Sequence, residues 1–135
     1  MPMVKMVDDA SASPAAKEVF DDIRGSRNTD YVNNIWRTLA VHPPMLKRFW
    51  NYMKEVMIEE SRLDSLTKEY IYLAVSMTNN CEYCIHTHIA AARKKGMDDE
   101  MLAELVEIVA LANAGNRLTQ GLQVEVDERF KPRFD

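Results

Sequence analysis

Two cysteines and two histidines within ten residues form the stretch of this sequence best equipped for chemistry. The segment NNCEYCIHTH occupies residues 79–88 and holds Cys81 and Cys84 in a C-x-x-C spacing, followed by His86 and His88. A thiolate is a nucleophile, a redox group and a metal ligand, and a neutral imidazole is a base and a metal ligand. The combination therefore indicates thiol redox chemistry or metal binding.

The same segment is predicted to begin a helix. It is followed by the run IAAARKK, which is rich in the helix formers Ala and Lys, and then by Gly96, a helix stop signal. Cys81 and Cys84 would then lie in the first helical turn. There, unpaired N–H groups and the positive end of the helix dipole favour a thiolate over a thiol.

Helical geometry selects one histidine as the partner of the cysteines. At about 100° per residue, Cys84 and His88 lie about 40° apart around the helix axis, and Cys81 and His88 lie about 20° apart. Because a long helical side chain points toward the N-terminus, His88 would lean over Cys84. His86 lies about 140° from Cys81 and is expected to face solvent.

A buried acid is predicted on the preceding helix. Glu69 stands in an apolar row, one helical turn from Leu66 and one from Leu73. Burial disfavours the charged form, so the pKa of Glu69 is expected to be raised, which would allow it to relay a proton near neutral pH. Alternatively, Glu69 is a structural acid paired with an Arg or Lys. The nearby Tyr70 and Tyr72 predict packing only.

The elements that would position these residues are predicted to be all-α, with about six helices and short connections. Apolar residues recur at helical spacing, and no stretch shows the alternation of a strand. The first helix is expected to begin at Ser13-Pro14 and to end at Gly25. The fourth is expected to be capped by Asp64 or Ser65. The last is expected to be capped by Asp98 and to fade near Gly115, with another turn at residues 118–122.

Composition and charge exclude several classes of function. The 135 residues suit one domain, and a hydrophobic content of 47% can form a core without disulfides or metal. The net charge is −4, from 17 Lys and Arg and 21 Asp and Glu that are interspersed, so nucleic acid is not an expected partner. No stretch has the roughly 18 apolar residues of a membrane span or the apolar run of a signal peptide. We therefore expect a cytoplasmic protein with no membrane partner, where a C-x-x-C is typically redox-active or metal-binding.

Four of these residues together resemble a known family pattern. Glu69, Cys81, Cys84 and His88 form E-x11-C-x-x-C-x3-H, which is similar to the pattern of alkylhydroperoxidase D-like proteins of the carboxymuconolactone decarboxylase superfamily. The resemblance covers about residues 45–112. It implies a single alkylhydroperoxidase D-like helical domain over residues 1–135, which forms trimers or hexamers and needs no cofactor and no metal.

The resemblance also implies a role for each residue. Cys84 would be the peroxidatic nucleophile, Cys81 the resolving cysteine, and His88 and Glu69 a proton relay that activates the thiols. The substrate would be a hydroperoxide, which oxidises a thiolate to a sulfenic acid. The second thiol would condense with it to a disulfide, which an external thiol or dithiol reductant would reopen. The implied function is that of an antioxidant thiol-dependent peroxidase.

Other interpretations stay open. Cys81 and Cys84 could be half of a zinc site, with His88 as third ligand and Glu69 or water as fourth, although a site of four thiolates cannot form within a chain that has two cysteines. An inert buried pair is another reading. The chain could also be a carboxymuconolactone decarboxylase-like enzyme, but the lactone decarboxylases proper lack the cysteine pair. Finally, it could be a non-catalytic thiol redox sensor.

An oligomer is expected on physical grounds as well. The helical stripes are rich in Met, Trp and Phe, and together they exceed what a single small core can hide. The helix that carries Phe49, Trp50 and Met53 is predicted to lie partly at an interface between copies of the chain.

Overall fold

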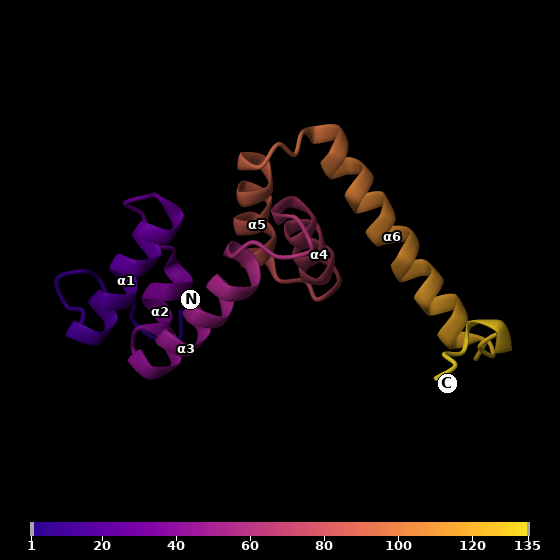
Figure 1. Ribbon diagram of the computed structural model, residues 1–135, viewed down its shortest axis with the longest axis horizontal. Coiled ribbons are helices and arrows are strands. Elements are labelled where there is room, and N and C mark those ends of the chain that lie inside the picture. The colour runs from indigo at the N-terminus through magenta and orange to yellow at the C-terminus, as the bar shows by residue number, and fades with distance from the viewer. Residues whose placement is uncertain (1, 135) are drawn as a thin grey trace. The chain divides into compact units, whose positions relative to one another are not determined.

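A computed structural model of the protein describes residues 2–134. Within these residues the chain forms six α-helices and no strand, so the all-α prediction is confirmed (Figure 1). The helices fall into two compact units, Met1–Leu63 with α1 to α3 and Asp64–Asp135 with α4 to α6. That the whole chain acts as one functional domain remains a prediction.

The first unit is a small helical cluster. Its elements are α1 (Pro14–Arg27), α2 (Asn34–Leu39), α3 (Pro43–Met53) and a short π-helix (Lys54–Ile58). Ser13 caps α1 as predicted, because its side chain accepts a hydrogen bond from the Ala16 N–H at 3.2 Å. The predicted stop at Gly25 is wrong. The helix continues to Arg27, and Asn28 ends it by taking the left-handed conformation with φ 50°.

Two tryptophans form the centre of this unit. Trp36 and Trp50 meet edge to face with ring centroids 5.2 Å apart, and both are almost fully buried. The Trp50 Nε1–H donates to Asp22 at 2.6 Å. Trp50 therefore belongs to the core of its own unit, whereas 39% of Phe49 on the same helix is exposed. That this helix lies partly at an interface between copies of the chain stays a prediction.

The second unit carries the chemically interesting residues. Its elements are α4 (Ser65–Thr78), α5 (Glu82–Lys94), α6 (Asp99–Gly121) and a 3-10 turn (Glu128–Phe130). Asp64 caps α4 by accepting the Thr67 N–H, and Asp98 caps α6 by accepting the Met101 N–H. Leu73 of α4 packs with Ala92 and Met97 in the core of this unit, and all three are buried. This packing holds α4 and α5 side by side.

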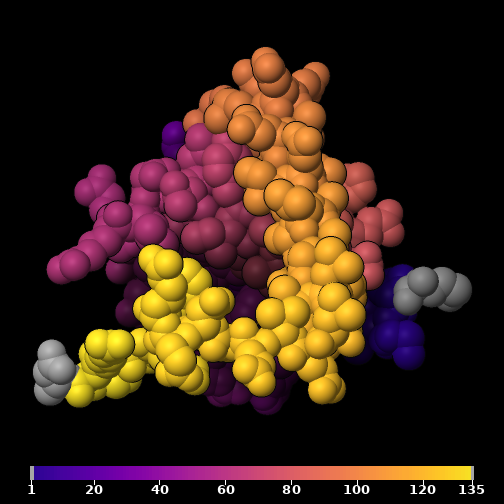
Figure 2. Space-filling view, turned by 90° about the vertical axis from the view of Figure 1, so that its right-hand side faces the viewer, coloured from indigo at the N-terminus to yellow at the C-terminus, as the bar shows by residue number. Residues whose placement is uncertain are grey.

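Helix α6 is longer than the sequence predicts. It runs without a break for 23 residues through Gly115, where a fading end was expected. One helical glycine costs only about 1 kcal/mol, which good helix formers on both sides can offset. No residue of α6 is buried in the chain, and 57–73% of Ile108, Leu111 and Leu118 is exposed. Figure 1 shows the C-terminal half of α6 extending away from α4 and α5, and Figure 2 shows the helix (orange) along its length.

Within residues 2–134, no helix combines the length and the apolar character needed to cross a membrane.

Candidate functional site

The C-x-x-C lies at the start of α5, as the sequence predicts. Thr78 ends α4, and the chain turns through Asn80, whose φ of 56° is left-handed, a conformation that asparagine tolerates better than most residues. Cys81 is the N-cap of α5, and its Sγ accepts a hydrogen bond from the backbone N–H of Cys84 at 3.3 Å. This tight turn directs both sulfurs to the same end of the helix.

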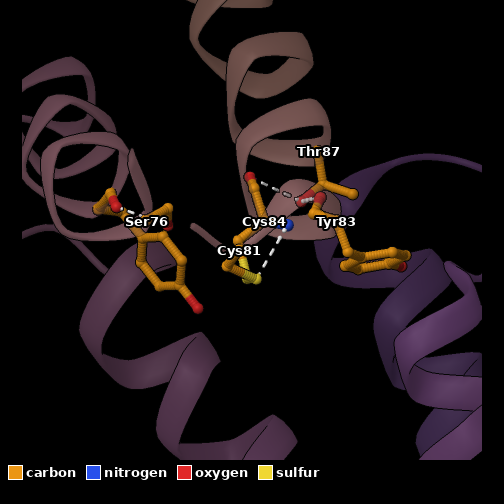
Figure 3. Close-up of a disulfide and its surroundings, with 6 residues drawn as sticks. Ser76, Cys81, Tyr83, Cys84 and Thr87 are labelled. Atoms are coloured by element: carbon orange, nitrogen blue, oxygen red, sulfur yellow. Dashed lines mark hydrogen bonds between the residues drawn. A yellow bond between two sulfur atoms is a disulfide. The ribbon is translucent and has the colours of Figure 1, made fainter. Parts of the chain in front are cut away.

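Cys81 and Cys84 are joined by a disulfide. The Sγ atoms are 2.10 Å apart and the Cα atoms 5.3 Å apart, and both residues are half-buried (Figure 3). Tyr83 lies between the two cysteines in the sequence, and Figure 3 shows its side chain projecting away from the disulfide. His86 is exposed, as predicted. The turn at the start of α5 thus holds the two sulfurs at bonding distance.

A hollow of about 390 Å³ opens at the same turn. Its lining residues are Asn80, Glu82, Ile85 and His86. These residues flank Cys81 and Cys84 in the chain, but neither cysteine lines the hollow.

Glu69 and His88 meet across the contact between α4 and α5. The Oε2 atom of Glu69 lies 2.6 Å from Nδ1 of His88, and the two side chains are 5% and 15% exposed. An ionised carboxylate has only acceptor atoms. When Glu69 is ionised, Nδ1 of His88 therefore carries the hydrogen and donates it.

A third group, Lys95, completes this arrangement. Its Nζ donates to the other carboxylate oxygen, Oε1 of Glu69, at 2.7 Å. Lys95 is the C-cap of α5, directly before Gly96, whose φ of 106° ends the helix. The sequence left an unspecified Arg or Lys open as a partner of Glu69. A signal for Lys95 was present, since it follows His88 by seven residues, as His88 follows Cys81.

The expected rise in the pKa of Glu69 is wrong. Burial raises the pKa, but the hydrogen bonds from His88 and Lys95, together with their charges, outweigh it and leave the pKa below the ordinary value of 4.5. The expectation considered burial alone, and the two donors were not visible in the apolar row around Glu69. Glu69 is therefore a carboxylate at neutral pH.

Tyr72 is a contact that the sequence analysis missed. Its ring stacks on the imidazole of His88, with ring centroids 3.7 Å apart and an angle of 22° between the planes. Tyr72 follows Glu69 by three residues, so both face α5 from the same side of α4. The imidazole is held in its plane by the tyrosine and at its Nδ1 edge by the carboxylate.

The predicted site residues form two groups. Within residues 2–134 no hydrogen bond joins His88 to either sulfur, although His88 lies one turn from Cys84 on α5, about 6 Å along the axis. Across the same residues, no set of three or more His, Cys, Asp or Glu side chains is placed to hold a metal ion. The arrangement offers a redox pair at the helix start and a fixed imidazole one turn behind it.

The chain is similar to proteins of a known family. The sequence profile described as "Carboxymuconolactone decarboxylase family" matches residues 43–125. The structure of the alkylhydroperoxidase AhpD core from Rhodospirillum rubrum ATCC 11170 is 52% identical and superposes with a TM-score of 0.93, covering 96% of this chain and 97% of that one. "Uncharacterized protein 4 in cox locus" of Paracoccus denitrificans is 32% identical over 63 residues, which are 47% of this chain and 57% of that protein. The chain thus spans little more than half of that curated relative.

Proposed function

The chain belongs to the carboxymuconolactone decarboxylase family, and we propose that it is a thiol-dependent peroxidase that reduces hydroperoxides through Cys81 and Cys84. The observation that carries the proposal is the disulfide-forming pair at the start of α5, one turn before an imidazole fixed by a buried carboxylate. The likeness to the alkylhydroperoxidase AhpD core over nearly the whole chain supports it.

The first proposed step is the oxidation of Cys84 in the dithiol form. His88 takes the thiol proton at Nε2, since Nδ1 already donates to Glu69. The thiolate attacks one peroxide oxygen, an S–O bond forms and the O–O bond breaks. The departing alkoxide takes a proton from the imidazolium and leaves as an alcohol, while Cys84 becomes a sulfenic acid.

The second step closes the disulfide. Cys81 attacks the sulfur of the sulfenic acid, an S–S bond forms and water leaves. Two thiols and one hydroperoxide thus give one disulfide, one alcohol and one water. An external thiol or dithiol reductant then returns both cysteines to thiols by exchange, and it is oxidised to its own disulfide. No bound cofactor or metal takes part in this sequence.

Glu69 acts in this proposal through His88. As a carboxylate it keeps Nδ1 protonated, orients the ring together with Tyr72, and balances the positive charge that His88 gains. Together His88 and Glu69 form the proton relay, in which the proton moves at Nε2 and Glu69 stays ionised.

Two rival functions fit less of the site. A lactone decarboxylase of the kind suggested by the family resemblance has no use for the cysteine pair. A non-catalytic redox sensor would use Cys81 and Cys84, but it has no need of the buried couple between Glu69 and His88. Hydroperoxide consumption sustained by a dithiol separates the peroxidase from both.

We expect the relay to be measurable as turnover. With a hydroperoxide and a dithiol donor, Glu69→Gln should retain the fold but lower peroxidase turnover by at least about tenfold, at the low end of general-base contributions. Donors of the dihydrolipoyl, thioredoxin and glutathione types should be compared, because their exchange chemistry differs. The matched control is Glu104→Gln, which removes the same charge at an exposed position of α6. If Glu69→Gln keeps full turnover between about pH 6 and 8, Glu69 is a structural acid and takes no part in the proton relay.

The order of oxidation of the two cysteines is a second prediction. After peroxide treatment of the reduced variants, Cys81→Ser should accumulate a sulfenic acid at Cys84, whereas Cys84→Ser should leave Cys81 largely unoxidised. The reason is that His88 lies one helical turn from Cys84 and two turns from Cys81. A sulfenic-acid probe read by peptide mass spectrometry measures both. The opposite labelling would invert the assignment, and no labelling in either variant would contradict the peroxidase.

The third proposal concerns assembly and location. The exposed apolar side chains of α6 support a homo-oligomer, a trimer or a hexamer as the family resemblance implies. The cytoplasmic location expected from the sequence also stays a prediction. Light scattering at micromolar concentration should give a multiple of the 15.5 kDa chain mass. A monomer would rule this assembly out.

A further inference from the structure

Lys95 is placed to influence the charge of Glu69 in the hydrogen-bonded pair of Glu69 and His88. The Glu69 carboxylate is shared between two donors on α5, with Oε2 bound to His88 Nδ1 at 2.6 Å and Oε1 bound to Lys95 Nζ at 2.7 Å. The carboxylate is almost completely buried, while the Lys95 side chain is 31% exposed. A buried carboxylate is costly unless its charge is compensated, and Lys95 supplies a cation that does not depend on the protonation of His88.

The charge of Glu69 decides which nitrogen of His88 can act as the base. A neutral imidazole has one N–H and one acceptor nitrogen. Opposite an ionised carboxylate the N–H must be Nδ1, which leaves Nε2 as the acceptor. A protonated Glu69 could instead donate to Nδ1, and Nε2 would then carry the hydrogen and be unable to take a thiol proton.

We propose that Lys95 is a positioning residue that keeps Glu69 ionised and directed at His88 Nδ1, so that Nε2 remains the proton acceptor for the thiols. This inference rests on the proposed peroxidase function for its chemical meaning. The effect of the Lys95 charge on Glu69 and His88 is independent of that function, because all three side chains lie within one unit of the chain.

The surroundings contain few other charges that could take over this role. His88 of α5 and the C-cap Lys95 are the two residues whose hydrogen bonds act most strongly on the Glu69 carboxylate. From α6, the side chains packed into the same cluster are Met101, Leu102 and Leu105, which carry no charge. On α4, the neighbouring Lys68 is buried and has interactions of its own. We therefore expect the loss of Lys95 to change the protonation of the pair of Glu69 and His88 directly.

The direction of the effect follows from the sign of the charges. The Lys95 cation makes it harder for the Glu69–His88 pair to bind a further proton, because it stabilises the carboxylate and repels an imidazolium. Without it, we expect the pair to hold a proton to higher pH. Since a protonated pair cannot take the thiol proton, the acid limb of the peroxidase pH profile should move to higher pH as well.

The test compares Lys95→Met, Lys95→Arg and the control Lys94→Met. The control removes the same charge from the adjacent, exposed position of α5. The first readout is an NMR pH titration of the disulfide form, which follows the side-chain carboxyl carbon of Glu69 and the ring nuclei of His88 and needs no peroxide. The second is the pH profile of peroxide-driven oxidation of the reduced protein, with circular dichroism to verify folding.

We expect the titration midpoint of the pair to move to higher pH in Lys95→Met, to return toward the wild-type value in Lys95→Arg, and to stay unchanged in Lys94→Met. The oxidation rate of Lys95→Met should fall by at least about threefold near pH 5 and by less than about twofold near pH 8. An unchanged midpoint in folded Lys95→Met, or an equal shift in Lys94→Met, would overturn the proposal even if the protein is a peroxidase. A shifted midpoint in a protein that consumes no hydroperoxide would uphold the electrostatic role of Lys95 and refute the peroxidase function alone.

Discussion

A single buried carboxylate organises the candidate site. Glu69 reaches from α4 to α5 and binds His88 with one oxygen and Lys95 with the other. Each of these contacts would be worth little on a solvent-exposed surface. Around a carboxylate that is 5% exposed, they compensate a charge whose isolation would cost several kcal/mol. The ring position of His88 and the ionisation of Glu69 depend on this interaction, which adds a polar contact to the apolar packing between α4 and α5.

Helix α5 arranges the chemistry along one line. The N-cap Cys81, the central His88 and the C-cap Lys95 follow one another at intervals of seven residues, so they lie near one face of the helix. The helix start favours a thiolate, and the helix end accepts a cation. The same helix thus presents the cysteine pair at one end and a charge-compensating group at the other, with the imidazole between them. Tyr72 of α4 completes this arrangement by stacking on the ring.

The sequence predicted the fold class and the position of the C-x-x-C at a helix start, because these depend on local patterns. Caps such as Asp98 and the C-x-x-C at the helix start are read from neighbouring residues, whereas the pairing of Glu69 with His88 was implied only by the family resemblance. The helix ends expected at Gly25 and Gly115 were misplaced for local reasons, but the errors at the site have a common origin in tertiary contacts. The pKa of Glu69 was judged from its apolar neighbours in the chain, whereas His88 and Lys95 lower it from another helix. The stacking of Tyr72 was invisible for the same reason.

The central claim is that the two cysteines act as one two-electron redox unit toward hydroperoxides. The most direct measurement is an anaerobic titration of the fully reduced protein with a hydroperoxide, without any added reductant. Free thiols, remaining hydroperoxide and the alcohol product are counted together. Both thiols of the chain should be lost for each hydroperoxide converted to alcohol, with an end point at one equivalent per chain. Thiols that persist beyond that equivalent, or thiol loss without matching alcohol, would contradict it.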